Sequence, residues 1–212
     1  SDYDGLVIDK NLPGREIRLT RTDGTAPNCL SGQASEPATL TGNTCTVMSD
    51  TSGNYKFKEL TLGEYSVVEM SVRSWVVTLP ASLGTEPATY VLAGESNDTH
   101  TRDFGNFKTR SVVGHVIDDE NMSGTWDRGE GRLAGWTVVL TDPFGVESTT
   151  LTDSAGKYVF SKIGAGEFTI SQVLQKEWEQ ISPNFPYVLP SISGENLLGA
   201  NFLNHLMPAE VE

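Results

Sequence analysis

The sequence predicts an all-β protein made of two tandem β-sandwiches. Short runs of alternating apolar and polar residues recur along the chain, and 21 glycines and 10 prolines among 212 residues separate them. No helical stripe with a period of 3.6 residues has a useful length. The chain also contains an internal repeat, so about seven strands occur twice, each time in about 100 residues.

The repeat is clearest in the second half of each copy. Residues 50–57 match residues 153–160, and Trp75 matches Trp178, all at a spacing of 103 residues. Trp75 and Trp178 therefore occupy the same place in both copies, and we expect them to anchor the two cores; the alternative is a platform on which sugars stack. A constant spacing over this length indicates two homologous modules.

Insertions distinguish the two copies. Residues 5–9 match residues 114–118 at a spacing of 109, whereas residues 12–14 match residues 133–135 at a spacing of 121. The second copy has therefore gained 12 residues between these anchors. The first copy has 18 extra residues before Asp50, and these contain both cysteines.

The repeat also sets the domain boundaries. Near the end of each copy, residues 103–106 match residues 201–204 at a spacing of 98. We expect one module at 1–109, a second at 110–207, and an acidic tail at 208–212.

Strands are expected throughout both modules, with turns such as residues 142–145 between them. The expected ranges are about 4–9, 15–21, 44–49, 54–59, 64–70, 74–79, 88–92 and 102–107 in the first module, and 112–118, 136–141, 147–152, 157–161, 167–173, 177–182, 186–190 and 198–204 in the second.

Residues 119–130 have the ligand spacing of a calcium-binding loop. Oxygen-bearing side chains occupy positions 1, 3, 5, 9 and 12, and a glycine occupies position 6. The expected ligands are Asp119, Asn121, Ser123, the carbonyl of Thr125, Asp127 directly or through water, and Glu130. The alternative is a solvated acidic loop, because the same residue types favour turns.

The surroundings of the loop favour a structural ion over a sensor. The loop follows residues 112–117, which form a β-type run, whereas the loop of an EF-hand lies between two helices. Trp126, at position 8, is expected to pack the loop onto the sandwich.

The two cysteines, Cys29 and Cys45, lie in one segment that reads as a loop rich in Ser, Thr, Pro and Gly. They are expected to form a local disulfide, which implies an oxidising compartment. Two free thiols are the alternative. A metal pair is disfavoured because neither His nor further Cys accompanies them.

Composition limits the function. A net charge of −13 disfavours nucleic acid as a partner, and no apolar run is long enough to insert into a membrane. His100, His115 and His205 are scattered, and no arrangement typical of a nucleophilic enzyme is present. The chain begins at Ser1 without a signal peptide, so we expect a piece of a longer protein.

Five segments of the second module together carry a family resemblance: 114–119, 127–130, 133–140, 152–160 and 164–170. They resemble the B repeats of bacterial serine-aspartate-repeat (SdrD B-like) surface proteins and the Cna-B-like domain of collagen adhesin. The first module keeps the downstream half of the pattern and lacks the loop.

The resemblance implies an immunoglobulin-like or prealbumin-like sandwich in a stalk that carries an adhesive head. It also implies Ca²⁺ in the loop, held by the ligands named above, with Asp118 as a further ligand. Asp9 survives in the first module, but no run of ligands follows it, so no equivalent site is expected there.

The family also raises an internal Lys–Asn isopeptide bond. Glu69 occupies the position of the catalytic acid and Asn106 that of the asparagine. Lys10, however, lies at the end of the first strand beside the turn, and the second module has Gln172 in place of the acid, so neither bond is expected. Glu69 is instead expected to be a surface acid at a strand end.

The function expected is structural: a spacer or stalk of a secreted or cell-surface bacterial protein, adhesin-like and without enzymatic activity. Its partners would be the neighbouring domains of a longer surface protein and a host or matrix ligand. The alternative is a ligand- or carbohydrate-binding module of a larger secreted protein.

Overall fold

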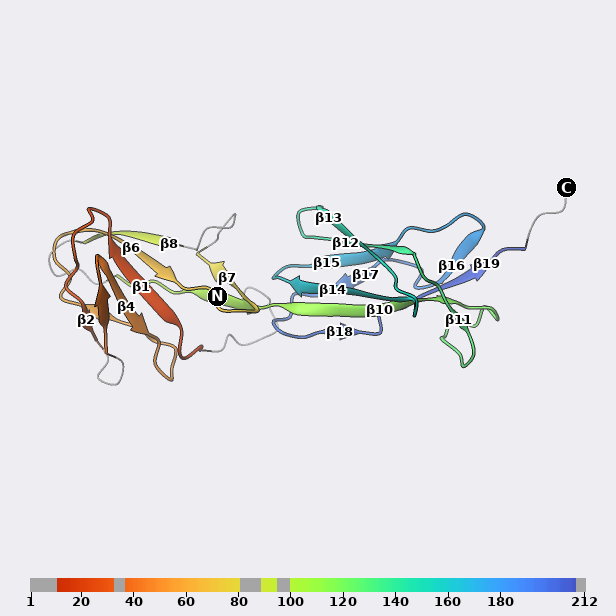
Figure 1. Ribbon diagram of the computed structural model, residues 1–212, viewed down its shortest axis with the longest axis horizontal. Coiled ribbons are helices and arrows are strands. Elements are labelled where there is room, and N and C mark those ends of the chain that lie inside the picture. The colour runs from red at the N-terminus through yellow and green to blue at the C-terminus, as the bar shows by residue number, and fades with distance from the viewer. Residues whose placement is uncertain (1–10, 33–36, 81–88, 95–99, 209–212) are drawn as a thin grey trace. The chain divides into compact units, whose positions relative to one another are not determined.

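The computed structural model describes residues 11–32, 37–80, 89–94 and 100–208. The chain divides into two compact units, Ser1–Phe107 (unit 1) and Lys108–Glu212 (unit 2). Strands are the only regular elements in the described residues, which confirms the all-β prediction (Figure 1). In this part of the chain, no helix could cross a membrane.

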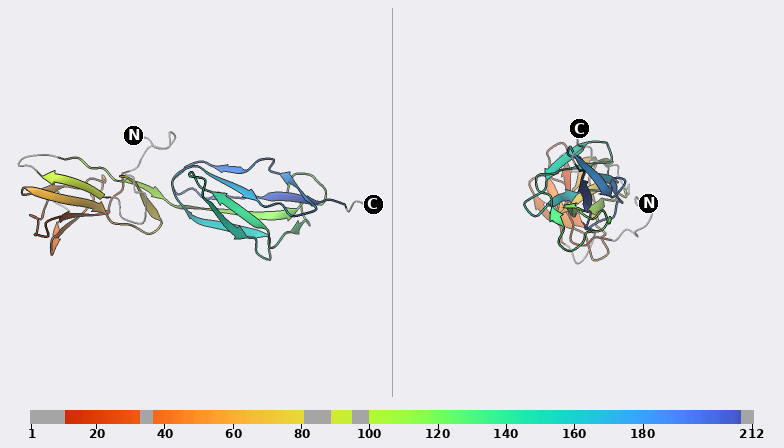
Figure 2. Two further views of the ribbon diagram at one scale, coloured as in Figure 1. Left: turned by 90° about the horizontal axis from the view of Figure 1, so that it is seen from above. Right: turned by 90° about the vertical axis from the view of Figure 1, so that its right-hand side faces the viewer.

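Unit 2 is a sandwich of two sheets, seen from two further sides in Figure 2. The first sheet consists of β11 (Gly131–Arg132), β10 (Arg110–Asp118), β19 (Phe202–Leu206) and β16 (Trp178–Ser182) in that order, with β14 (Lys157–Ile163) and β18 (Leu197–Leu198) also paired to β10. The second sheet has the order β13 (Glu147–Leu151), β12 (Thr137–Thr141), β15 (Phe168–Gln172) and β17 (Tyr187–Leu189).

The core of unit 2 lies between these sheets. Alternate residues of each strand point inward, so Val116 of β10 and Phe202 of β19 face Val138 of β12 and Ile170 of β15. All four side chains are fully buried. The apolar alternation of the sequence therefore forms the interior of a two-layer sandwich.

Unit 1 contains one large sheet and two small sheets of two strands each. The large sheet has the order β3 (Thr39–Thr41), β4 (Thr44–Met48), β1 (Glu16–Arg21), β6 (Gly63–Glu69) and β8 (Thr89–Gly94). Two two-stranded sheets pair β2 (Leu30–Ser31) with β5 (Phe57–Lys58), and β7 (Trp75–Leu79) with β9 (Gly105–Lys108).

The disulfide joins the large sheet of unit 1 to the segment before β2. Cys29 and Cys45 are bonded, with their Cα atoms 5.3 Å apart. Cys29 lies just before β2, whereas Cys45 belongs to β4, within the strand expected at 44–49. Cys45 is fully buried, because its side chain points into the core beside Leu19 and Val67. Only the description of its surroundings as a loop is wrong.

Most of the predicted strands are present, with three kinds of difference. The strand expected at 4–9 lies outside the described residues. Strands β2, β3 and β11 were not predicted, since each has only two or three residues. The strand expected at 198–204 is split into β18 and β19 around Gly199, whose φ of +80° breaks the extended backbone.

The repeat is visible in atomic detail at two equivalent turns. The carboxylate of Asp50 accepts hydrogen bonds from the backbone amides of Ser52 and Asn54 at 2.8 and 2.9 Å. The carboxylate of Asp153 accepts bonds of the same lengths from the amides of Ala155 and Lys157. The same local interaction therefore shapes both turns.

A second repeated feature is a buried hydroxyl. Ser49 Oγ donates to the carbonyl of Leu12 at 2.7 Å and accepts the amide of Arg15 at 2.9 Å. In unit 2, Thr152 makes the same pair of bonds to Leu133 and Trp136, with the same lengths. Because Arg15 and Trp136 donate to equivalent hydroxyls, they occupy equivalent positions in the two units.

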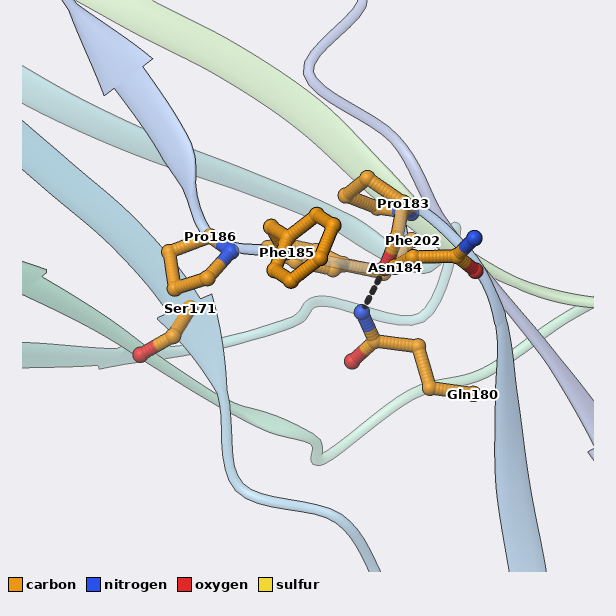
Figure 3. A pocket seen from close by; sticks show the side chains of 7 residues that line it. All are labelled: Ser171, Gln180, Pro183, Asn184, Phe185, Pro186 and Phe202. Carbon is orange, nitrogen blue, oxygen red and sulfur yellow. Dashed lines mark hydrogen bonds between the residues drawn. The ribbon is translucent and has the colours of Figure 1, made fainter.

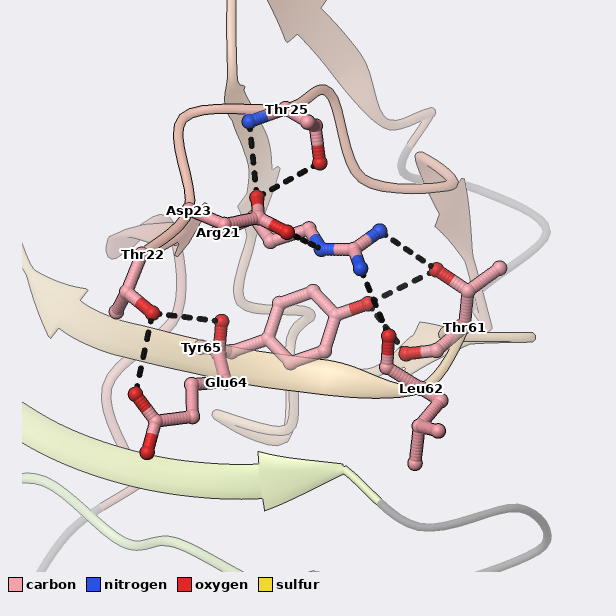
Figure 4. Close-up of polar contacts among 8 residues, drawn as sticks. All are labelled: Arg21, Thr22, Asp23, Thr25, Thr61, Leu62, Glu64 and Tyr65. Atoms are coloured by element: carbon pink, nitrogen blue, oxygen red, sulfur yellow. Dashed lines mark hydrogen bonds and ion pairs between the residues drawn. The ribbon is translucent and has the colours of Figure 1, made fainter.

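In unit 1, Arg21 holds two loops together (Figure 4). Its guanidinium pairs with Asp23 at 3.0 Å and donates to Thr61 Oγ1 and to the carbonyl of Leu62 at 3.1 and 2.8 Å. Tyr65 donates its hydroxyl to the carbonyl of Thr61 at 2.6 Å. The loop after β1 is thereby fixed to the loop before β6.

Candidate metal centre

The predicted calcium loop starts where β10 ends, and the sheet fixes its first ligand. The amide of Asp119 donates to the carbonyl of Asn204 on β19 at 2.7 Å, which continues the ladder between the two strands by one bond. The side chain of Asp119 is fully buried. Its carboxylate accepts the backbone amides of Ser123 and Gly124 at 2.9 and 2.8 Å.

A sharp turn at the middle of the loop allows this arrangement. Gly124 has a φ of +71°, a conformation that side chains with a Cβ adopt rarely. The turn brings the amide of Gly124 onto the carboxylate of Asp119. Glycine at position 6 therefore has the conformational role that the spacing predicted.

Asp127 lies at the junction of the other predicted ligands. Its carboxylate accepts hydrogen bonds from Ser123 Oγ at 2.8 Å and from Asn121 Nδ2 at 3.0 Å, and these bonds hold its pKa below the usual range. Ser123 Oγ also lies 3.1 Å from the carbonyl oxygen of Thr125. The structure thus brings together the oxygens of residues separated by up to six positions.

Glu130 closes the loop and has an oxygen without a partner. Its Oε2 accepts the amide of Asp127 at 2.8 Å, while its Oε1 is buried and has no hydrogen-bond partner in the described structure. Burial raises the pKa of Glu130, and the nearby carboxylates of Asp119 and Asp127 raise it further.

The loop gathers oxygen donors of the kind that a hard divalent cation prefers. The charges of Asp119 and Asp127 disfavour the ionised form of Glu130, and a divalent ion would offset that repulsion and give Glu130 Oε1 a partner. No three Asp, Glu, His or Cys side chains of the described residues are spaced to hold a metal by themselves. The amide, hydroxyl and carbonyl oxygens of Asn121, Ser123 and Thr125 would therefore have to complete the shell, as calcium sites require.

Trp126 packs the loop against the sandwich. Its ring centroid lies 5.1 Å from that of His115 on β10, and the guanidinium carbon of Arg132 on β11 lies 4.9 Å from the indole. The indole is 38% exposed. Burial, followed by the charge of Arg132, lowers the pKa of His115.

Two histidines that the sequence showed as scattered lie beside the loop. His115 contacts Trp126, and the Nδ1 atom of His205 lies 3.1 Å from the carbonyl oxygen of Asp119. Asp118, named as a further ligand, is the last residue of β10 and lies opposite Asn204. Its pKa is raised by burial and then by Glu120.

Unit 1 has a buried polar cluster where the isopeptide bond was considered. Asn106 Nδ2 donates to Glu69 Oε2 at 2.8 Å, and Arg15 Nε lies 3.4 Å from Glu69 Oε1. Arg15 also stacks over Trp75, with 4.5 Å from its guanidinium carbon to the ring centroid.

The expectation that Glu69 is a surface acid is wrong. Its relative exposure is 1%, because the last residue of β6 points inward, as Tyr65 and Val67 do. Burial raises the pKa of Glu69, while the contacts with Asn106 and Arg15 oppose the rise.

In the repeat, the position that would supply the lysine of an isopeptide bond is occupied by Asp9, and Lys10 follows it by one residue. Asp118 lies opposite Asn204 in the parallel ladder, and the repeat aligns Asp9, not Lys10, with Asp118. Lys10 itself lies outside the described residues, so the absence of a bond stays a prediction. In unit 2, Gln172 takes the place of the acid and donates to Asn204.

A pocket of about 350 Å³ lies on unit 2, away from the loop (Figure 3). Its lining consists of Ser171, Gln180, Pro183, Asn184, Phe185, Pro186 and Phe202. Gln180 turns its amide toward the carbonyl of Pro183 (Figure 3). The lining contains no ionisable group, so it offers no acid, base or nucleophile.

Comparison with known proteins confirms the resemblance inferred from the sequence. Residues 110–184 match the SdrD B-like domain family. Over 189 residues the chain is 32% identical to serine-aspartate repeat-containing protein F of Staphylococcus epidermidis, covering 80% of the chain and 12% of that protein. It is 31% identical to Colossin-A of Dictyostelium discoideum, covering 85% of the chain and 2% of that protein. The chain therefore spans a small part of the length of these relatives.

Solved structures with detectable similarity include GBS52, the minor pilin of Streptococcus agalactiae. The alignment covers 96% of this chain and 87% of that chain, with 11% identity and a TM-score of 0.38. The Bacillus anthracis TIE protein aligns over 93% of this chain and 32% of its own, with 14% identity and a TM-score of 0.39.

Proposed function

Because residues 110–184 carry an SdrD B-like domain, we propose that this chain is a structural spacer in a bacterial cell-surface protein. In this role the two units separate a functional part of the protein from its attachment point. Neighbouring domains of the same longer protein are the partners that this role requires, and the location is extracellular.

The observation that carries the proposal is the pairing of the terminal strands of unit 2. β10 begins two residues after the start of this unit and β19 ends near its last described residue, and the two strands run parallel. Their ladder pairs Val116 with Phe202 and Asp118 with Asn204. A pull on the two ends would slide one strand along the other, so several hydrogen bonds would have to break together. This geometry suits a segment that transmits tension.

We also propose that Ca²⁺ in the loop 119–130 braces this ladder. Asp119 is both the first proposed ligand and the residue whose amide extends the ladder to Asn204. An ion that binds only the folded state adds RT ln(1 + [L]/Kd), which is about 2.7 kcal/mol at a hundredfold excess over Kd. Extracellular calcium, at roughly millimolar concentration, would fill even a weak site of this kind.

Terbium luminescence tests the ion site directly, because Trp126 lies within the loop and can sensitise bound Tb³⁺. We expect Trp-excited luminescence that Ca²⁺ displaces and that Glu130→Ala removes. The matched control is Glu120→Ala, which removes an exposed carboxylate at position 2, outside the ligand pattern. Equal loss of signal in both variants would contradict the ligand assignment.

Pulling single molecules of the whole chain from its two ends tests the spacer function. We expect unit 2 to unfold at a higher force in Ca²⁺ than in EDTA, and the difference to disappear in Glu130→Ala. Unfolding of unit 2 at low force in both solutions would contradict a role in bearing tension.

The pocket of Figure 3 supports a second candidate, a ligand- or carbohydrate-binding module. The ring of Phe185 is 78% exposed at the pocket, and exposed aromatic rings suit stacking against sugars. Saturation-transfer NMR with a panel of glycans would test it. Binding that Phe185→Ala abolishes would favour this function over a pure spacer.

A further inference from the structure

Strand β13 leaves one edge of unit 2 open to pairing. It is the outermost strand of its sheet, and among the described strands it pairs only with β12 (Figure 1). Unpaired amide and carbonyl groups along such an edge form a template for a further strand. Proteins therefore usually protect their edges with prolines, bulges, lysines or very short strands.

The other edge strands of unit 2 carry protections that β13 lacks. β16 has an irregular register with β19, β14 carries two lysines, and β17 has only three residues, between Pro186 and Pro190. β13 is regular over its five residues and contains no proline, glycine or lysine. Its edge is therefore suited to receive a further strand.

The ladder with β12 determines which backbone groups of β13 are free. The amide of Asp142 donates to the carbonyl of Val146 at 2.9 Å, so these two residues form a hydrogen-bonded pair. In an antiparallel ladder such pairs alternate with pairs that are not hydrogen-bonded. The backbone amides and carbonyls of Glu147, Thr149 and Leu151 therefore point away from β12, toward the open edge.

The sheet face beside this edge carries a single charge. Val138, Leu140 and Ile170 face the core, so their neighbours in the same strands face outward. The outward residues of β12, β13, β15 and β17 are Thr137, Val139, Thr141, Glu147, Thr149, Leu151, Thr169, Ser171 and Val188. Only Glu147 among them is charged, in a chain whose net charge is −13. A charged partner would therefore find little complementary charge here.

We propose that β13 pairs antiparallel with β13 of a second copy of this chain, about a twofold axis at Thr149. In this register Thr149 lies opposite Thr149 of the second copy, and Glu147 lies opposite Leu151. The residues with outward backbone groups then face one another, so each pair can exchange two hydrogen bonds. A twofold contact of this kind uses the same surface on both copies.

The side chains of β13 are compatible with this self-pairing. Glu147 faces an apolar residue and not a second carboxylate, and a cross-strand pair of threonines is favourable. Leu151 and Val146 lie at opposite ends of the edge and are 63% and 62% exposed. Antiparallel pairing brings the end of one copy that carries Leu151 to the end of the other that carries Val146. Burial of this apolar surface would stabilise the pair.

The mass of the whole chain in solution tests the proposal. The net charge of −13 opposes association. Raising the salt from about 0.1 M to about 1 M shortens the screening length from about 10 Å to about 3 Å, and should lower the dissociation constant at least about tenfold. Light scattering over a concentration series should show the mass rising from 23.0 kDa toward twice that value, in EDTA as well as in Ca²⁺. A mass of 23.0 kDa at every concentration and both salt levels would overturn the proposal.

Charge substitutions at the twofold axis test the register. Thr149→Lys should abolish the dimer, because two ammonium groups would face each other, and an equal mixture of Thr149→Lys and Thr149→Glu should restore it. Thr169→Lys is the matched control, since it places the same charge on the outer face but on β15, away from the edge. Equal loss in the two lysine variants would indicate contact through the sheet faces and would overturn the edge pairing.

Hydrogen exchange identifies the strand that occupies the edge. The amides of Glu147, Thr149 and Leu151 should exchange more slowly as the concentration of the chain rises, whereas those of Ser148 and Thr150, which already bond to β12, should not change. Slow exchange of the first three amides in the monomer would show that another segment of the same chain covers the edge, and would overturn the proposal.

Discussion

The two units place different chemistry at the same buried position. In unit 1, Arg15 pairs with Glu69 and stacks over Trp75. In unit 2, the aligned Trp136 packs edge-to-face on Trp178, with 5.4 Å between the ring centroids. The same buried position, just before β1 in unit 1 and just before β12 in unit 2, therefore accepts either an arginine that pairs with Glu69 and stacks over Trp75 or a tryptophan that packs on Trp178.

The units also differ in their insertions. Unit 1 has a disulfide from Cys29 to Cys45 in its inserted segment, and unit 2 has the loop 119–130 between β10 and β11. Small β-sandwiches gain stability from such cross-links. We therefore expect unit 1 to depend on its disulfide and unit 2 to depend on the ion proposed for its loop.

The largest effect is expected from breaking the ion pair of unit 1. Arg15→Trp leaves Glu69 buried without its cation, and Glu69→Gln leaves Arg15 buried without its anion. Each should lower the free energy of unfolding of unit 1 by about 3–5 kcal/mol, because an uncompensated buried charge is costly. Urea unfolding followed by unit-specific hydrogen exchange would measure the loss.

The double variant Arg15→Trp with Glu69→Gln reproduces the residues of unit 2. It should recover most of the stability lost in each single variant, since replacing a whole buried pair is often neutral or stabilising. If the two losses simply add, the positions are not coupled and the comparison fails.

Reduction of the disulfide should have the next largest effect. The bond closes a loop with a sequence separation of 16 residues. The chain-entropy model gives about 3 kcal/mol for a loop of this length. We expect Cys29→Ser to lower the stability of unit 1 by that amount and to leave unit 2 unchanged. A loss shared by both units would argue against their independence.

A smaller loss of stability, of equal size in the two units, is expected when the buried hydroxyl of Ser49 or Thr152 is removed. Ser49→Ala and Thr152→Val each leave a buried amide and a buried carbonyl without this partner. Each substitution should cost about 1–3 kcal/mol in its own unit. Calorimetry of the two variants would check this, and an effect in only one unit would show that the bonds are not energetically equivalent.

The smallest effect is a difference in pH dependence. The raised pKa of Glu69 means that its contribution to the stability of unit 1 is present below the ordinary value of 4.5 and is lost as the pH rises through the folded pKa. The pKa of Asp153 is lowered by the amides of Lys157 and Ala155, so its contribution to unit 2 is present above 3.8 and is lost on acidification. Carboxyl NMR titrations would establish both directions. A Glu69 pKa below 4.5 would contradict the first.

Most of the strands and the repeat follow from local patterns in the sequence. The turn at Asp153 and the alternation in β12 are encoded within a few residues, so the sequence predicts them well. The burial of Glu69 does not follow from such patterns, because an acid at a strand end resembles a surface residue. Its partners Arg15 and Asn106 lie 54 and 37 positions away, and only the fold brings them together.

For the candidate metal site, too, local features could be predicted from the sequence and long-range contacts could not. The spacing of the proposed ligands in residues 119–130 is local, so it can be read from the sequence alone. The contacts of the loop with His115, Arg132 and His205 depend on how the strands pair, so they could not be predicted. The repeat alone shows that Arg15 corresponds to Trp136 in the sequence. That the two residues occupy the same structural position follows only from the equivalent hydrogen bonds of Ser49 and Thr152.

The most direct test of the calcium-braced spacer is thermal unfolding of the whole chain in Ca²⁺ and in EDTA, followed separately for each unit. We predict that Ca²⁺ raises the transition of unit 2 and not that of unit 1, and that Asp119→Ala or Glu130→Ala abolishes the shift whereas Asp9→Ala does not. An unchanged unit 2, or equal losses in all three variants, would contradict the account.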